Sequence, residues 1–156
     1  MFNNYSLSGI ALTEINNEVL TLNTDANLVF FALGVNDRWK SNFTDFQNKI
    51  NYLISIYSNP NLNSQLVVLD FSWYWTIEED KIKQELKRLA DNTNAIYIDF
   101  NKVLGNKTLE ELKNIGFLET DDIHPPIKGH QYLAEVIAKK VGLGCTSKMM
   151  AEKLLN

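Results

Sequence analysis

The chain has a single cysteine, Cys145, in its 156 residues. One cysteine cannot form an internal disulfide bond, and no cysteine–histidine cluster has the spacing of a zinc site. We also find no linker, internal repeat or low-complexity tract. A chain of this length corresponds to one domain and is large enough to bury a real hydrophobic core, so we expect a single domain over residues 1–156.

The chain also has fewer basic residues than acidic residues. Fifteen lysines and arginines stand against nineteen aspartates and glutamates, which gives a net charge of −4. Because no basic patch stands out, nucleic acid is not expected as a partner. No apolar stretch has the length of a membrane span, and the N-terminus lacks the basic and apolar segments of a signal peptide. We therefore expect no membrane span and a cytoplasmic location, while secretion from a longer precursor stays open.

The main structural feature that is present is an unbroken apolar run, Leu28–Leu33. It shows no alternation of apolar and polar residues, which is typical of a strand buried on both faces in a parallel sheet covered by helices. The run stops at Gly34 and leaves Asn36 and Asp37 at its carboxyl end. Ligands of open α/β sheets bind outside the carboxyl ends of the strands, so Asn36 occupies a position where a functional side chain is expected.

Strands and helices are expected to alternate along the rest of the chain. The patterns predict strands over 3–9, 28–33, 65–71 and 95–100, and helices over 10–22, 41–58, 78–90, 128–141 and 148–155. A further short helix is expected to begin at Thr108, because Glu111 three residues later completes a capping box. This alternation predicts an α/β fold with a parallel sheet and helices on both of its faces.

A second informative stretch contains Asp121, His124 and Pro125. An acid and a histidine three residues apart can form a hydrogen bond on the loop that precedes a helix, and Pro125 restricts His124 to an extended backbone. A carboxylate on one imidazole nitrogen fixes the tautomer and leaves the other nitrogen to act as a general base. Taken alone, such residues are more often helix caps and surface groups.

Combined with two upstream segments, this stretch resembles the SGNH hydrolases, the GDSL-type esterases and lipases. Residues 4–9 are similar to the second block of that family, and residues 34–37, Gly-Val-Asn-Asp, to its third block, Gly-x-Asn-Asp. Residues 121–125 are similar to its last block. The resemblance covers residues 3 to about 141 and implies a flavodoxin-like, three-layer α/β/α sandwich with a parallel sheet.

The resemblance also implies hydrolysis of an ester without a cofactor. The backbone N–H of Gly9 and the side-chain amide of Asn36 would stabilise the oxyanion, His124 would act as the base, and Asp121 would orient it. Asparagine suits this role because its amide donates without carrying a charge or a titrating proton. The substrate would be a small acyl ester or an acetylated carbohydrate, and an O-acyltransferase that uses the same site stays open.

One block of the family is missing from the chain. The first block, Gly-Asp-Ser-x-x-x-Gly, should carry the nucleophilic serine and the first strand upstream of Asn4. Three explanations stay open: an N-terminally truncated enzyme, a catalytically inactive binding or assembly domain, or the use of Ser8 as a substitute nucleophile. In each case the sheet lacks its first strand, and a homodimer or a partner segment could cover the gap.

Other candidates lie near the same strand ends. Trp73 and Trp75 follow the strand expected at 65–71, where they would line an acyl or sugar subsite or pack over the sheet edge. Asp37 and Arg38 would either touch the substrate or form a surface pair, and the surface pair is the favoured expectation.

Two further ligand classes are not expected. Asp121, Asp122, His124 and His130 could in principle gather a metal ion, but His130 should face away on the following helix. A flavodoxin-like phosphate or nucleotide binder is also disfavoured, because no glycine-rich phosphate loop follows any strand.

Overall fold

The computed structural model describes residues 9–21, 26–71, 80–118 and 124–143. Several expectations from the sequence fall outside these ranges. They concern most of the strand at 3–9 with Ser8, the aromatic residues Trp73 and Trp75, the acid Asp121 with its neighbour Asp122, and the last helix at 148–155.

Three parallel strands form the sheet of the described residues, in the order β1 (Leu28–Phe31), β2 (Gln65–Asp70) and β3 (Ile96–Asp99). In their register, Phe31 lies beside Val68 and Asp70 lies beside Asp99. The helices are η1 (Leu12–Glu14, a 3-10 helix), α1 (Asn17–Thr21), α2 (Asp37–Lys40), α3 (Phe43–Tyr57), α4 (Lys81–Thr93), α5 (Phe100–Val103), α6 (Leu109–Asn114) and α7 (Ile127–Lys140).

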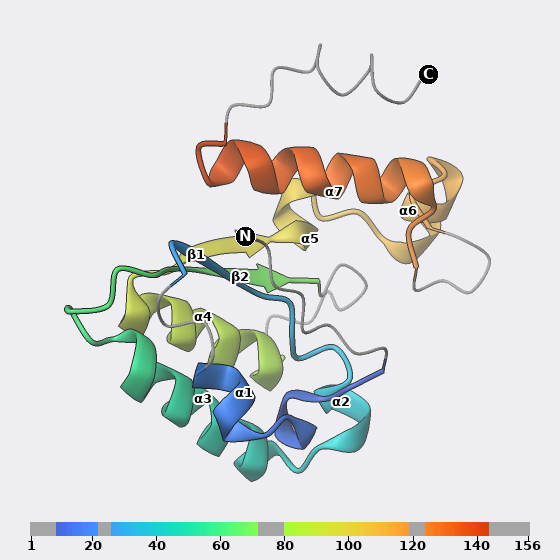
Figure 1. Cartoon of the computed structure of the whole chain (residues 1–156). Helices are drawn as coiled ribbons and strands as arrows, with labels where there is room; N and C mark the ends of the chain where they lie inside the picture. The colour runs from blue at the N-terminus through green and yellow to red at the C-terminus, as the bar shows by residue number, and fades with distance from the viewer. Residues whose placement is uncertain (1–8, 22–25, 72–79, 119–123, 144–156) are drawn as a thin grey trace.

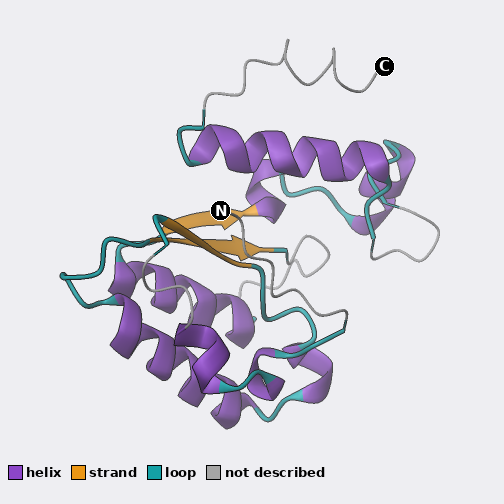
Figure 2. Cartoon of the chain, in the orientation of Figure 1, coloured by secondary structure: helices purple, strands orange, loops and turns teal. Residues whose placement is uncertain are grey.

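Helices cover both faces of the sheet (Figure 1, Figure 2). Residues of η1, α1, α3 and α4 share one hydrophobic core with Val68 of β2, whereas residues of α5, α6 and α7 share a second core with Val67. Successive strand residues point to opposite faces, so these two neighbouring valines enter different cores. The predicted α/β fold, with a parallel sheet and helices on both faces, is confirmed. No described helix combines the length and apolar character that crossing a bilayer requires.

The helix signals read from the sequence are largely confirmed. In α3 the Asn42 side chain accepts a hydrogen bond from the Thr44 N–H at 2.9 Å and caps the helix. The predicted capping box of α6 is present, because Thr108 and Glu111 bond to each other's backbone N–H. The helix expected at 78–90 is observed as α4, which begins three residues later because the side chain of Asp80 caps it.

Two predictions are corrected by the structure. The single helix expected at 10–22 is replaced by η1 and α1, because the backbone of Ile15 is extended and ends η1. The strand expected at 28–33 ends at Phe31, and it is not buried on both faces, since Phe30 is 40% exposed. β2 is the described strand with both faces buried, because its successive residues enter the two cores on opposite faces of the sheet.

A close contact fixes the turn between β1 and α2. Gly34 has a φ of +98°, a backbone conformation that residues with a side chain rarely adopt. A Cβ atom on Gly34 would come within 2.9 Å of Ile82 Cγ2 and 3.3 Å of Leu86 Cδ1 in α4. The glycine therefore lets the chain pass in close contact with α4 as it leaves β1. This turn places Asn36 at the carboxyl edge of the sheet.

Candidate functional site

The carboxyl ends of the three strands meet at one edge of the sheet, as they must in a parallel arrangement (Figure 1). Asn36 and α2 follow β1 at this edge, and Asp70 and Asp99 end β2 and β3. Helix α7 runs opposite to the strands, so its N-terminal end is directed toward this edge (Figure 1). In the chain, His124 comes three residues before α7 begins. This edge is where open α/β sheets bind ligands.

The start of α2 holds the segment 9–13 through a dense set of hydrogen bonds. The Asn36 side-chain amide donates to the Ile10 carbonyl oxygen at 2.9 Å. The Asp37 carboxylate accepts from the Leu12 N–H at 2.8 Å, and the Lys40 ammonium donates to the Gly9 carbonyl oxygen at 2.6 Å. The Asn36 and Lys40 side chains thus hold the carbonyl groups of the neighbouring residues Ile10 and Gly9. We call the four holding side chains, Asn36, Asp37, Lys40 and Ser41, the α2 clamp.

The predicted surface pair of Asp37 and Arg38 is wrong. Asp37 is only 2% exposed, and its carboxylate binds Leu12, Thr13 and Ser41. Arg38 instead forms an ion pair with Asp80, in which both side chains are 9% exposed. The two neighbours therefore connect α2 to two different parts of the chain: Asp37 bonds to the η1 segment, and Arg38 pairs with the N-cap residue of α4. With its carboxylate bonded to Leu12, Thr13 and Ser41, Asp37 anchors the η1 segment to the start of α2.

His124 has an exposed side chain and lies just before α7. The following Pro125 is buried, and Pro126 is the N-cap residue of α7. A Cβ atom on Gly129 would lie 2.6 Å from Pro125 Cβ and 3.1 Å from the Phe117 carbonyl oxygen. The first turn of α7 is therefore packed tightly against the chain that carries His124, which fixes the backbone at this position.

His130 lies on α7 with an exposed side chain. Within the part of the chain that the structure describes, no group of three or more histidine, cysteine, aspartate or glutamate residues is arranged to hold a metal ion. Asp121, the predicted partner of His124, lies outside that part.

Sequence reasoning missed a buried group of charges at the same edge. Lys83 Nζ lies 3.0 Å from Asp99 Oδ2 and 3.7 Å from Asp70 Oδ2. The Tyr97 hydroxyl donates to Asp70 Oδ2 at 2.5 Å, and Asp70 and Asp99 are only 1% and 7% exposed. Burial, together with the negative charge of Asp70, raises the pKa of Tyr97 well above its usual range. We call these four residues the acid–lysine cluster.

A sequence signal for this cluster exists. Asp70 and Asp99 each end an otherwise apolar strand, so both belong to the edge at which Asn36 was expected. The pairing with Lys83 has no such signal, because it depends on how α4 lies across the two strands. Since the carboxylates face a lysine and a tyrosine of the chain itself, the cluster ties β2, β3 and α4 together.

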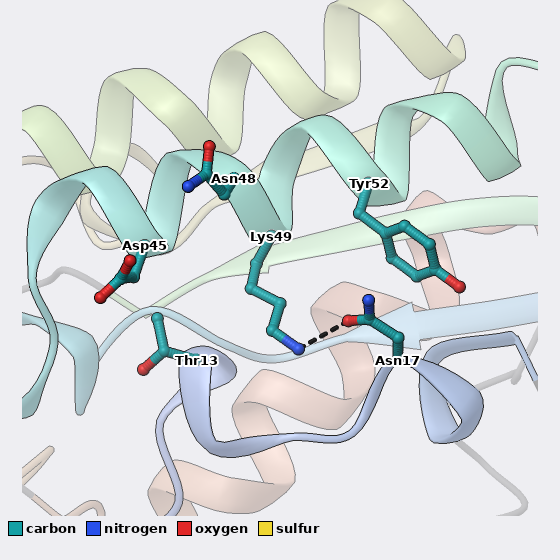
Figure 3. A pocket seen from close by; sticks show the side chains of 6 residues that line it. All are labelled: Thr13, Asn17, Asp45, Asn48, Lys49 and Tyr52. Atoms are coloured by element: carbon teal, nitrogen blue, oxygen red, sulfur yellow. Dashed lines mark hydrogen bonds between the residues drawn. The ribbon is translucent and has the colours of Figure 1, made fainter.

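A hollow of about 330 Å³ lies elsewhere, between α3 and the η1–α1 segment (Figure 3). It is lined by Thr13, Asn17, Asp45, Asn48, Lys49 and Tyr52. Figure 3 shows the Lys49 ammonium directed at Asn17, to which it donates at 2.6 Å, and it also donates to the Ile15 carbonyl oxygen at 2.6 Å. No residue predicted for catalysis lines this hollow, and its lysine is occupied in holding η1 and α1 against α3.

Comparison of the chain with protein-family models, with curated protein sequences and with solved structures finds no match.

Proposed function

We propose that this chain is an ester hydrolase domain of the SGNH type, in which Asn36 and Gly9 supply oxyanion donors and His124 and Asp121 supply the base and its acid. The proposal includes the finer fold assignment, a flavodoxin-like α/β/α sandwich. It is supported by the chain order of three motifs, by the position of Asn36 after the carboxyl end of β1, and by the N-terminal end of α7, close in sequence to His124, which is directed toward the same edge.

The observation that carries the proposal is the hydrogen bond from Asn36 to Ile10, at 2.9 Å. A primary amide nitrogen has two N–H groups. One of them is held by the Ile10 carbonyl oxygen, which fixes the plane of the amide and leaves the second N–H for an oxyanion. Gly9 is the residue next to Ile10, so its backbone lies beside that amide.

Ester hydrolysis requires donors that are already aimed at the carbonyl oxygen when negative charge develops on it. A fixed asparagine amide and a backbone N–H meet this need without bringing a formal charge into the site. In this proposal the attacking group is the hydroxyl of Ser8 or of water, which bonds to the ester carbonyl carbon while His124 takes its proton. His124 then gives this proton to the departing alcohol as the ester bond breaks, and Asp121 holds the imidazole in the tautomer that can accept it. The substrate class is a small acyl ester or an acetylated carbohydrate.

Hydrolysis of p-nitrophenyl acetate tests the proposal. Its leaving group is activated, so an oxyanion hole and a base still accelerate its hydrolysis when other parts of the machinery are weak. We expect a rate above that of buffer, loss of most of this rate in His124→Ala, and full retention in His130→Ala. His130 is the matched control because it is the other histidine of the chain and is also exposed.

Two results would contradict the proposal. One is a wild-type rate equal to that of buffer, which would favour a binding or assembly domain of the same fold. The other is an equal effect of the two histidine substitutions, which would mean that His124 has no special role.

A further inference from the structure

We infer that Asp37 is a positioning residue that sets the geometry of the oxyanion donors, by fixing the backbone of the Gly9–Thr13 segment against the start of α2. This inference rests on the proposed function and adds to it a role for a residue that touches no reacting atom. The inference is supported by one arrangement: the neighbouring residues Asn36 and Asp37 bond to Ile10 and Leu12, which belong to the same segment.

The carboxylate of Asp37 accepts hydrogen bonds from three residues, Leu12, Thr13 and Ser41. Its Oδ2 accepts from the Leu12 N–H at 2.8 Å, and its Oδ1 accepts from the Thr13 N–H at 3.3 Å and from the Ser41 hydroxyl at 2.7 Å. The first N–H groups of a helix have no partner inside it. Asp37 therefore caps η1 from a position 25 residues further along the chain from Leu12.

These bonds close a small ring of chain. The Asn36 side chain holds the carbonyl group of Ile10, the Asp37 side chain holds the N–H of Leu12, and the backbone joins each pair of residues. Two attachment points fix both the position and the angle of a segment, whereas a single hydrogen bond would leave it able to rotate. Oxyanion donors must be placed within about 0.5 Å to be effective, so this ring has a direct consequence for the rate.

The remaining clamp residues reinforce the same arrangement. The Ser41 hydroxyl lies 2.5 Å from the Thr13 hydroxyl and donates to Asp37, so it orients the carboxylate. Lys40 binds the Gly9 carbonyl oxygen but is about half exposed. Asp37 is the buried centre of the clamp. The hydrogen bonds that it accepts end on its charged carboxylate oxygens, and such bonds are stronger than those between neutral groups.

The kinetic constants of three variants on p-nitrophenyl acetate test this role. Asp37→Ala should lower kcat about 100-fold with KM nearly unchanged, because displaced donors weaken only the transition state. Ser41→Ala should lower kcat less, since it leaves the Leu12 bond in place. Asp80→Asn is the control: it breaks the buried ion pair that joins α2 to α4, keeps a capping side chain for α4, and should leave kcat unchanged.

A purely structural role gives a different pattern. If Asp37→Ala and Asp80→Asn both lower the melting temperature while kcat per folded molecule stays at the wild-type value, the inference is overturned. Should Asp37→Ala fail to fold, Ser41→Ala decides the matter by the same comparison of kcat.

A second readout separates this inference from the proposed function. In two-dimensional NMR spectra, the side-chain amide signals of Asn36 should move in Ser41→Ala and Asp37→Ala and stay in place in Asp80→Asn. This holds even if the wild-type chain shows no hydrolysis, which would remove the proposed function alone. Unchanged Asn36 signals in the two clamp variants would contradict the positioning role.

Discussion

The α2 clamp and the acid–lysine cluster lie at the same edge of the sheet but use their polar groups differently. Four bonds of the clamp run from side chains to backbone atoms of a segment more than twenty residues away, such as Asn36 to Ile10. In the acid–lysine cluster, side chains meet side chains, as Lys83 meets Asp70 and Asp99. The clamp thus fixes where a stretch of backbone lies, whereas in the cluster one lysine is shared between two carboxylates.

This difference teaches what each group can contribute. A side chain that holds backbone transfers its own position to the N–H and carbonyl groups of that backbone, which is what an oxyanion hole requires. A buried cluster of charges that pair with one another mainly sets stability, because removing one partner leaves the others uncompensated. Substitutions in the clamp should therefore change the rate of hydrolysis more than stability, and those in the cluster should do the reverse.

The largest expected effect is that of Asn36→Ala. Removal of one oxyanion donor typically costs about 10²–10³ in rate, so kcat should fall by that factor. The melting temperature should fall only slightly, because a single partly buried hydrogen bond to Ile10 contributes about 1 kcal/mol. Steady-state kinetics and a thermal melt of the same preparation check both values. A large loss of stability with an unchanged kcat would place Asn36 with the structural residues instead.

A smaller effect, on stability, is expected for Lys83→Met. The substitution keeps the length of the side chain but leaves Asp70 and Asp99 beside each other without their cation. Breaking a fully buried ion pair costs 3–5 kcal/mol, and because Lys83 is 22% exposed we expect roughly 2 kcal/mol. Urea unfolding measures this value. The kcat of the folded variant should match the wild type, and a fall of kcat comparable to that of Asn36→Ala would erase the contrast between the two groups.

The smallest effect is expected for Tyr97→Phe, and it depends on pH. Loss of the hydrogen bond to Asp70 should cost about 1 kcal/mol at neutral pH. The pKa of Tyr97 is raised in the folded state, first by burial and then by Asp70, so the folded protein keeps this proton above pH 10, where the unfolded chain releases it. The stabilisation by the bound proton is therefore complete below about pH 10 and is lost as the pH rises further.

The measurement is the free energy of unfolding of both proteins between pH 9 and pH 11. The wild type should lose up to about 1.4 kcal/mol per pH unit more than Tyr97→Phe above pH 10, which brings the two curves together. Tyr57, whose pKa burial also raises, affects both proteins equally. Parallel curves would show that Tyr97 releases its proton equally easily in the two states.

Periodicity and capping residues were enough to predict much of the fold. The helix expected at 41–58, the capping box that begins at Thr108 and the strand expected at 65–71 rest on local signals, and they are confirmed by α3, α6 and β2. The apolar run at 28–33 led to the wrong prediction of a strand buried on both faces. An unbroken apolar sequence does not show whether both faces of its strand are covered. Phe30 is exposed although its neighbours in sequence are just as apolar as those of β2.

The candidate site was only partly predictable for the same reason. Asn36 and His124 were found through short motifs at strand and helix ends, which sequence records directly. The burial of Asp37 and its capping of η1 are contacts across 25 residues, and no local pattern encodes them. The pairing of Arg38 with Asp80, 42 residues away, likewise replaces the expected pair of chain neighbours.

The central claim is that Asn36 and His124 act on the same ester in one site. A double-mutant cycle on p-nitrophenyl acetate hydrolysis, with wild type, Asn36→Ala, His124→Ala and the double variant, measures this directly. Oxyanion donors still support a residual rate when the base is removed, so each single substitution should lower the rate and the double variant should be slower than either. If either single substitution leaves the rate unchanged, or if Asn36→Ala causes no further loss in the His124→Ala background, the two residues do not serve one reaction and the account is contradicted.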